Sequence, residues 1–307
     1  MDIIEDLTSF VSRSKKPLIV ILGPTASGKT GISLNLAKKI KGEIISTDSR
    51  QIYKGLEIGS DIILPEDRQG IPHHMLAIKN PDQTLTLREY QEQATKIINE
   101  IHERESTPML VGGTGLYISS IIEGYNVPHI PPNRKLREKL TKEAEEKGHE
   151  HVHNILKELD PGSAKKIHPN NLPYIIRAIE INKSAGHNKQ DKKSKPNFDT
   201  YMLGIKWPRE QLYERVNLRV DLQIKRGLIE EVQALLNKGY DLNLPAMTSL
   251  GAKELVPYIK GEMSLEEALE ILKRNTRRYA KRQMTWFKRY DNVKWLEPSQ
   301  VEKITNT

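Results

Sequence analysis

The sequence predicts an α/β fold in which a parallel sheet with helices on both faces is interrupted by a helical insertion. Short apolar runs alternate with helical segments through the first third of the 307-residue chain, which is the usual pattern of strands joined by crossover helices. The alternation stops at the proline-rich stretch VPHIPPNRK, and a charge-dense helical segment follows. A chain of this length can bury one large core and still form a second lobe.

The elements of the core are expected in a regular order. Short apolar runs predict buried strands, and apolar residues spaced i, i+4 predict helices that pack on them. Strands are expected at 18–22, 43–47, 108–113 and 201–207, and helices at 29–40, 88–103 and 116–124. Ser264 and Glu267 have the spacing of a capping box and predict the start of a later helix.

These elements divide the chain into two domains. The core is expected to comprise residues 1–127 and 200–307, and the helical insertion residues 128–199. Near its end the insertion contains the polar run HNKQDKKSKP, residues 187–196, which predicts a loop.

Composition narrows the class of protein. Charged residues make up 29% of the chain, and no apolar run approaches the ~20 residues that a membrane helix needs, so no membrane partner is expected. The chain has no cysteine, and its start, MDIIEDLTSF, lacks the basic residues of a secretory signal; both features fit a cytoplasmic protein. A net charge of +8 favours a polyanionic partner such as nucleic acid. We expect a monomer.

The stretch GPTASGKT matches the phosphate-loop pattern G-x-x-x-x-G-K-[ST], between an expected strand and an expected helix. This context predicts a P-loop NTPase-like sheet. The loop amides and the helix N-terminus would bind phosphate, Lys29 would add a charge, and the Thr30 hydroxyl suits Mg²⁺. The pattern does not distinguish a nucleoside triphosphate from a diphosphate ester. The predicted phosphate ligands are Gly23, Pro24, Thr25, Ala26, Ser27, Gly28, Lys29 and Thr30.

Two further segments are expected beside this loop. STDSRQIYKG follows the second strand and GGTGLY follows the third, and loops after parallel strands share one rim of the sheet. Asp48 therefore places a carboxylate near the phosphates. It could bind a magnesium ion, as in many phosphate-loop enzymes, or act directly on a substrate.

A basic helix is expected near the C-terminus. Residues 274–290, RNTRRYAKRQMTWFKRY, contain seven Lys or Arg and no acid. On a helical wheel these seven share an arc of about 140°, with the aromatic residues and Gln283 opposite. A stripe of one sign fits contact with a nucleic-acid backbone, although it could also be a solvated face. This basic stripe comprises Arg274, Arg277, Arg278, Lys281, Arg282, Lys288 and Arg289.

With these motifs together, the chain resembles the tRNA dimethylallyltransferases, also called tRNA isopentenyltransferases. The matching segments are GPTASGKT, STDSRQIYKGLEIGS, GIPHH, LVGGTGLY, IHPNN with RAIE, LYERVNLRVD and KRQMTWF. The resemblance implies that the phosphate loop binds dimethylallyl diphosphate, with Mg²⁺, and that the dimethylallyl group goes to N6 of adenine 37 in the anticodon stem-loop of tRNA, which the insertion would grip.

The resemblance also assigns roles to residues. It implies that Asp48 is the base, that Thr114 lies at the reaction centre and that Arg219 contacts the diphosphate. It implies contacts with the tRNA at Asp48, Ser49, Arg50, Gln51, Thr114, Arg137, Pro173, Tyr174, Ile175, Ile176, Arg177, Gly251 and Lys253. The charge pattern of the basic stripe adds Arg277, Arg278, Lys281 and Arg282 to the predicted tRNA-binding residues. The chain departs from the family pattern at Ala77, Tyr174 and Ala252, and in GSDIILPED, which lacks a lysine common in the family.

Two other functions explain part of the sequence. A small-molecule kinase using ATP would account for the loop and Asp48, but not for the basic stripe or the insertion. A non-catalytic nucleic-acid-binding protein would account for the stripe, but would leave Asp48 and GGTG without a role.

Overall fold

The computed structural model describes residues 2–185 and 197–305. The chain divides into two compact units: a core, Met1–Gly124 with Lys195–Thr307, and an insertion, Tyr125–Ser194. The run at 187–196, for which a loop was predicted, lies entirely outside the described residues.

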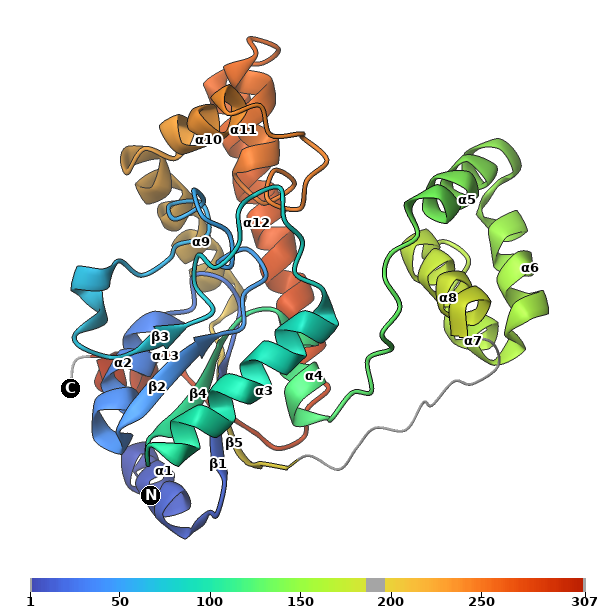
Figure 1. Cartoon of the computed structure of the whole chain (residues 1–307). Coiled ribbons are helices and arrows are strands. Elements are labelled where there is room, and N and C mark those ends of the chain that lie inside the picture. The colour runs from blue at the N-terminus through green and yellow to red at the C-terminus, as the bar shows by residue number, and fades with distance from the viewer. Residues whose placement is uncertain (1, 186–196, 306–307) are drawn as a thin grey trace. The chain divides into compact units, whose positions relative to one another are not determined.

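The core contains a six-stranded, entirely parallel sheet (Figure 1). Its order is β3-β2-β4-β1-β5-β6, which confirms the predicted parallel sheet. The near-continuous apolar sequences of β1 and β4 suit central strands that are covered on both faces. The strands are β1 Pro17–Leu22, β2 Gly42–Ser46, β3 His73–His74, β4 Thr107–Gly112, β5 Asp199–Ile205 and β6 Val293–Leu296.

Helices cover both faces of the sheet, and the side chains of β1 alternate between the two layers. Ile19 and Ile21 pack in a cluster with residues of α1, α2 and α13, while Leu18 and Val20 pack in a cluster with residues of α3 and α4. The helices of these layers are α1 Ile3–Arg13, α2 Lys29–Ile40, α3 Leu87–Glu103, α4 Gly115–Ile122 and α13 Pro298–Thr305.

The rest of the core is helical between β5 and β6. The helices are α9 Arg209–Lys225, α10 Leu228–Asn237, α11 Ala252–Ile259 and α12 Leu265–Phe287, and a short 3-10 helix, η1, spans Pro65–Arg68 near β3. The predicted capping box at the start of α12 is confirmed: the Ser264 Oγ accepts from the Glu267 amide at 3.2 Å, and Glu267 Oε2 accepts from the Ser264 amide at 2.9 Å.

The insertion forms a small helical core of its own from α5 Arg134–Lys147, α6 His149–Leu159, α7 Pro161–Lys166 and α8 Leu172–Ala185. Leu140, Val152, Leu156 and Ile179 are buried at its centre. The insertion also buries the carboxylate of Glu180, which accepts hydrogen bonds from Arg137, Arg177 and the Asn133 amide. These donors hold the pKa of Glu180 at about 2, against the opposing effect of burial.

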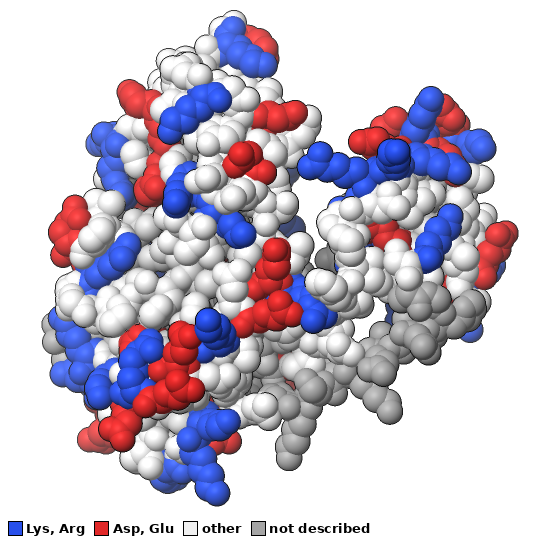
Figure 2. Space-filling model, viewed as in Figure 1, with Lys and Arg blue, Asp and Glu red and all other residues white. Residues whose placement is uncertain are grey.

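Charge is mixed on the face of the core seen in Figure 2, where basic and acidic side chains lie interspersed. The net charge of +8 therefore does not produce a single basic field on that face. Within the part of the chain that the structure describes, every helix is too short or too polar to span a bilayer.

Candidate active site

The phosphate loop joins β1 to α2, and side chains that are distant in the sequence donate hydrogen bonds to its backbone carbonyls. The Trp207 Nε1 donates to the Ser27 carbonyl at 2.9 Å, and the Arg215 Nε donates to the Ala26 carbonyl at 2.9 Å. Gly28 has a φ of 94°, a backbone conformation that favours glycine, at the turn into α2. These contacts therefore stabilise the conformation of the loop.

Lys29 lies inside this loop, where its Nζ donates to the carbonyls of Gly23 at 3.1 Å and Pro24 at 2.8 Å. Burial, and then the nearby Arg219, lowers the pKa of Lys29 to about 8, although Asp48 and Asp61 act in the opposite direction. An anionic ligand at the loop would favour the charged form of this side chain.

Asp48 and Thr114 lie on the same rim as the phosphate loop, because β2, β4 and β1 are neighbours in the sheet. The Thr114 amide donates to the Thr47 carbonyl at 2.9 Å, and the Thr114 Oγ1 accepts from the Ser49 amide at 3.0 Å. The Asp48 Oδ1 accepts from the Arg50 amide at 2.9 Å. Among the described residues, the other carboxylate oxygen of Asp48 has no hydrogen-bond partner, so it can accept from a substrate.

Helix α12 lies against the GGTG turn so closely that only glycine fits there. A Cβ at Gly113 would lie 2.1 Å from Gln283 Nε2, and one at Gly115 would lie 2.1 Å from the Trp286 ring. The glycines therefore allow the basic helix to pack directly on the strand end that carries Thr114.

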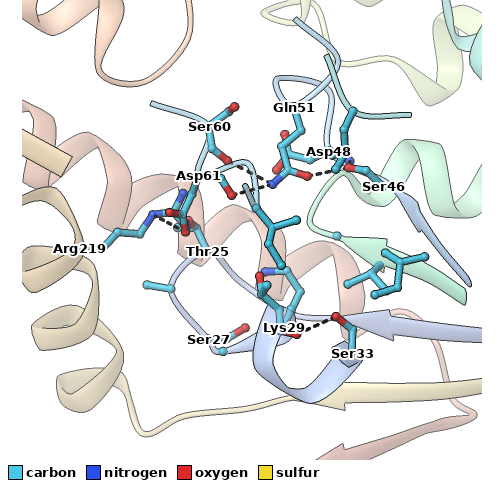
Figure 3. A pocket seen from close by; sticks show the side chains of 18 of the residues that line it. Thr25, Ser27, Lys29, Ser33, Ser46, Asp48, Gln51, Ser60, Asp61 and Arg219 are labelled. Carbon is cyan, nitrogen blue, oxygen red and sulfur yellow. Dashed lines mark hydrogen bonds and ion pairs between the residues drawn. The ribbon is translucent and has the colours of Figure 1, made fainter. Parts of the chain in front are cut away.

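Two cavities meet at Asp48. The first has a volume of about 380 Å³ and is lined by the phosphate loop, Arg215, Arg219 and the region around Asp61 (Figure 3). The second has a volume of about 240 Å³ and is lined by polar residues that include Tyr279 and Arg282. Thr25, Asp48, Ser60 and Arg219 line both cavities.

Each cavity is also lined by a serine whose buried hydroxyl lacks a hydrogen-bond partner within the described residues. Ser27 belongs to the first cavity and Ser249 to the second. Buried polar groups are rarely left unpaired, and such groups at a cavity wall indicate a place for a polar ligand.

Sequence reasoning placed several residues at this site, and the structure brings most of those in the core together. Ser49, Arg50, Lys253 and Arg282 line the second cavity. Gln51 lines the first cavity, where its Oε1 accepts from the Ser46 hydroxyl at 2.7 Å. Gly251 lines neither cavity and caps α11, donating its amide to Glu254 at 3.0 Å.

The residues of the insertion that were predicted to contact tRNA differ in exposure. Ile175 and Ile176 are buried in the core of the insertion, so their side chains cannot contact a tRNA, whereas Pro173 and Tyr174 beside them are exposed. Arg137 and Arg177 are partly exposed but pair with Glu180.

The basic stripe is also less uniform than the helical wheel predicted. Arg277 is half-buried and donates to Asn217 Oδ1 at 2.7 Å. Arg289 pairs with Glu123 at 2.6 Å and lies over the Trp286 ring at 4.2 Å. Arg289 is nevertheless exposed, as are Arg274, Arg278, Lys281, Arg282 and Lys288, as predicted.

Two residues of α12 that the helical wheel placed only opposite the basic stripe belong to the site. Gln283 contacts both the phosphate loop and Gly113. Tyr279 lines the second cavity, and burial, with the nearby Asp48 charge, raises the pKa of Tyr279 well above its ordinary value. The sequence feature that could have identified Tyr279 and Gln283 is their i, i+4 spacing on the side of the basic helix that faces the core.

The donor set limits which metal could bind. Within the described residues no group of three or more His, Cys, Asp or Glu could hold a metal ion. The first cavity offers the exposed Thr30 hydroxyl and the Asp48 carboxylate. Such sparse oxygen ligation fits Mg²⁺, which keeps several waters and binds substrate phosphates.

A phosphate loop on a parallel sheet, with a carboxylate shared by a phosphate cavity and a second polar cavity, defines a phosphate-loop protein built for group transfer. The family described as IPP transferase matches residues 51–290. The chain belongs to this family.

Two relatives are similar in sequence to this chain over nearly its whole length. A tRNA dimethylallyltransferase of Alkaliphilus oremlandii is 48% identical, with 95% of each chain covered. That of Acetivibrio thermocellus is 45% identical, with 93% of each chain covered.

Two solved structures are also similar to the structure of this chain. A full-length tRNA isopentenylpyrophosphate transferase of Bacillus halodurans has a TM-score of 0.71 and 40% identity, with 95% of each chain covered. A eukaryotic dimethylallyltransferase acting on tRNA has a TM-score of 0.75 and 27% identity, covering 92% of this chain and 74% of its own.

Proposed function

We propose that this protein transfers the dimethylallyl group of dimethylallyl diphosphate to N6 of adenine 37 in tRNA, giving N6-(dimethylallyl)adenosine and diphosphate. The observation that carries the proposal is that Asp48 lines both cavities. A diphosphate ester in the first cavity and an adenine in the second would meet at this carboxylate.

The residues of the first cavity suit a departing diphosphate. The loop amides, Lys29 and Arg219 supply positive charge where the C–O bond breaks and its electron pair stays on the diphosphate. Mg²⁺ bound at Thr30 would supply further charge stabilisation to the phosphate oxygens. The allylic carbon gains cationic character, so a weak nucleophile is sufficient.

The residues of the second cavity suit the acceptor. The N6 amino group is a weak nucleophile because its lone pair is delocalised into the adenine ring. As the new C–N bond forms, the amine becomes acidic, and the unpartnered oxygen of Asp48 can accept its proton. Thr114 and Tyr279 provide hydroxyl groups beside Asp48 that can orient the base.

The tRNA would be held outside the cavities by phosphate contacts. The exposed residues of the basic stripe can neutralise backbone phosphates without reading sequence. In the insertion, the exposed Pro173 and Tyr174 and the partly exposed Arg137 and Arg177 are the proposed contacts with the anticodon stem-loop.

One assay tests the proposed function. The protein is incubated with radiolabelled dimethylallyl diphosphate and unmodified tRNA, with and without ATP. We expect label in the tRNA without ATP. ATP consumption with a small acceptor would select a kinase instead, and tRNA binding without any transfer would select a non-catalytic RNA-binding protein.

A further inference from the structure

A carboxylate lies among the cations of the phosphate cavity. Asp61 lines the first cavity, and its Oδ1 lies 3.2 Å from Arg226 Nη1. Its Oδ2 lies 3.8 Å from Arg219 Nε. Arg219 in turn donates from Nη1 to the hydroxyl of Thr25 in the phosphate loop, at 2.6 Å (Figure 3). Asp61 therefore balances the charge of an arginine that reaches the phosphate loop.

The position of Asp61 is fixed by side chains that hold the backbone around it. The Gln51 Nε2 donates to the carbonyls of Ser60 and Asp61, each at 3.2 Å. On the other side, Glu231 accepts from the amides of Ile58 at 2.7 Å and Gly59 at 2.8 Å. Asp61 itself has a φ of 55°, a conformation that Asp and Asn tolerate better than most residues. The carboxylate is thus directed at the cavity by its surroundings.

We propose that Asp61 is a specificity-determining residue that limits how tightly the phosphate cavity holds polyanions. Its charge opposes any phosphate group that approaches Arg219, and the opposition grows with the charge of the ligand. A nucleoside triphosphate is therefore disfavoured relative to a diphosphate ester. On the proposed function, on which this role rests, the departing diphosphate carries an additional negative charge, so Asp61 also promotes its release.

A structural role for Asp61 gives the opposite expectation. If Asp61 served mainly to hold Arg219 in place, its loss would loosen the arginine and weaken phosphate binding. The hydrogen bond from Arg219 to Thr25 does not involve Asp61, so we expect the loss of repulsion to outweigh the loss of support.

The test measures the binding of inorganic pyrophosphate and of ATP to wild type and Asp61→Asn by calorimetry, without tRNA. Asn suits the positive φ, so the fold is expected to survive, and Asp61→Gly serves as a second variant without strain there. The matched control is Asp221→Asn, which removes an equal charge from α9 at a residue paired with Lys273 outside both cavities.

We expect Asp61→Asn to bind pyrophosphate about 3- to 10-fold more tightly than wild type, with a larger gain for ATP. Asp221→Asn should bind as wild type does. Unchanged or weaker binding in a variant with an unchanged thermal melt would overturn the proposal. Weakening seen only with Mg²⁺ would also overturn it, because Asp61 would then be a cation ligand. These binding measurements use no tRNA. If the tRNA assay failed, the proposed function would be refuted, but the effect of Asp61 on phosphate binding could still be determined.

Discussion

Gln283 joins the phosphate loop to the neighbouring strand end: its Oε1 accepts from the Thr25 amide at 2.8 Å, and its Nε2 donates to the Gly113 carbonyl at 3.0 Å. Gln283 is buried and belongs to α12, the helix that also bears the basic stripe. This side chain therefore links the helix that bears the stripe directly to the phosphate cavity.

Replacing Gln283 with Leu should lower kcat/KM for prenyl transfer by about 10- to 100-fold. Leu fills a similar volume but removes the partner of the part-buried Thr25 amide and of the buried Gly113 carbonyl, and an unpaired buried polar group costs about 1–3 kcal/mol. Steady-state kinetics would measure the effect, with Glu270→Gln on the exposed side of the same helix as the control. Normal kinetics in Gln283→Leu would show that the link is dispensable.

Asp48→Asn should lower the single-turnover rate by about 10²- to 10⁴-fold, the usual cost of losing an acid–base group. The amide oxygen of Asn can still accept from the Arg50 amide, so the local turn and tRNA affinity should be kept. The measurement pairs single-turnover transfer with tRNA binding. A near-normal rate would remove Asp48 from the mechanism.

The affinity for pyrophosphate should fall as the pH rises above about 8. The pKa of Lys29 is lowered to about 8, so its positive charge is present below that pH and is lost above it. Calorimetry between pH 7 and 9.5 would follow the change. Lys29→Met, measured alongside, should bind more weakly at pH 7 and show only the pH dependence that comes from the ligand's own titration. Parallel curves for the two proteins would contradict the assignment.

A buried carboxylate, Glu43, paired with the partly exposed Arg104, should make the core sensitive to acid. Hydrogen bonds from Arg104, opposed by burial and aided by His74, lower the pKa of Glu43 to about 2 from its ordinary 4.5. The stability that this carboxylate contributes is present above pH 4.5 and is lost as the pH falls toward 2.

Glu43→Gln should therefore lower the free energy of unfolding by about 2–4 kcal/mol at pH 7, and the difference from wild type should shrink below pH 4.5. Glu92→Gln, which breaks an exposed pair with Arg88, should cost at most about 1 kcal/mol. Denaturant unfolding at pH 7 and pH 3 measures both variants. A constant difference across this range would disprove the role of the ionised carboxylate.

The sequence could predict what depends on neighbours along the chain. The strand before GPTASGKT, the capping box at Ser264 and the shared rim of Asp48 and Thr114 all follow from periodicity and parallel connectivity. It could not predict contacts between distant segments. Gln283 was placed only on the helix face opposite the basic stripe, because nothing near position 283 indicates that Thr25 lies beside it. The burial of Ile175 likewise depends on helix packing that a motif does not encode.

The last prediction concerns the exposed part of the basic stripe. Arg278→Glu combined with Lys281→Glu should weaken the binding of all tRNAs alike. Both residues are exposed on α12 and line an open surface pocket beside Trp286, so the core should stay intact. Phosphate contacts release counterions, so losing two contacts should flatten the slope of log affinity against log salt by roughly 1.4–1.8.

Lys15→Glu with Lys16→Glu is the matched control, because these exposed lysines precede β1, at the opposite end of that strand from the phosphate loop. Affinities at several salt concentrations, with thermal melts to check folding, give both slopes. The ranking among tRNAs should not change, because backbone contacts carry no sequence information. An unchanged slope in a folded stripe variant would mean that these residues form only a solvated face, and the tRNA would have to be held by the insertion and the rim of the second cavity.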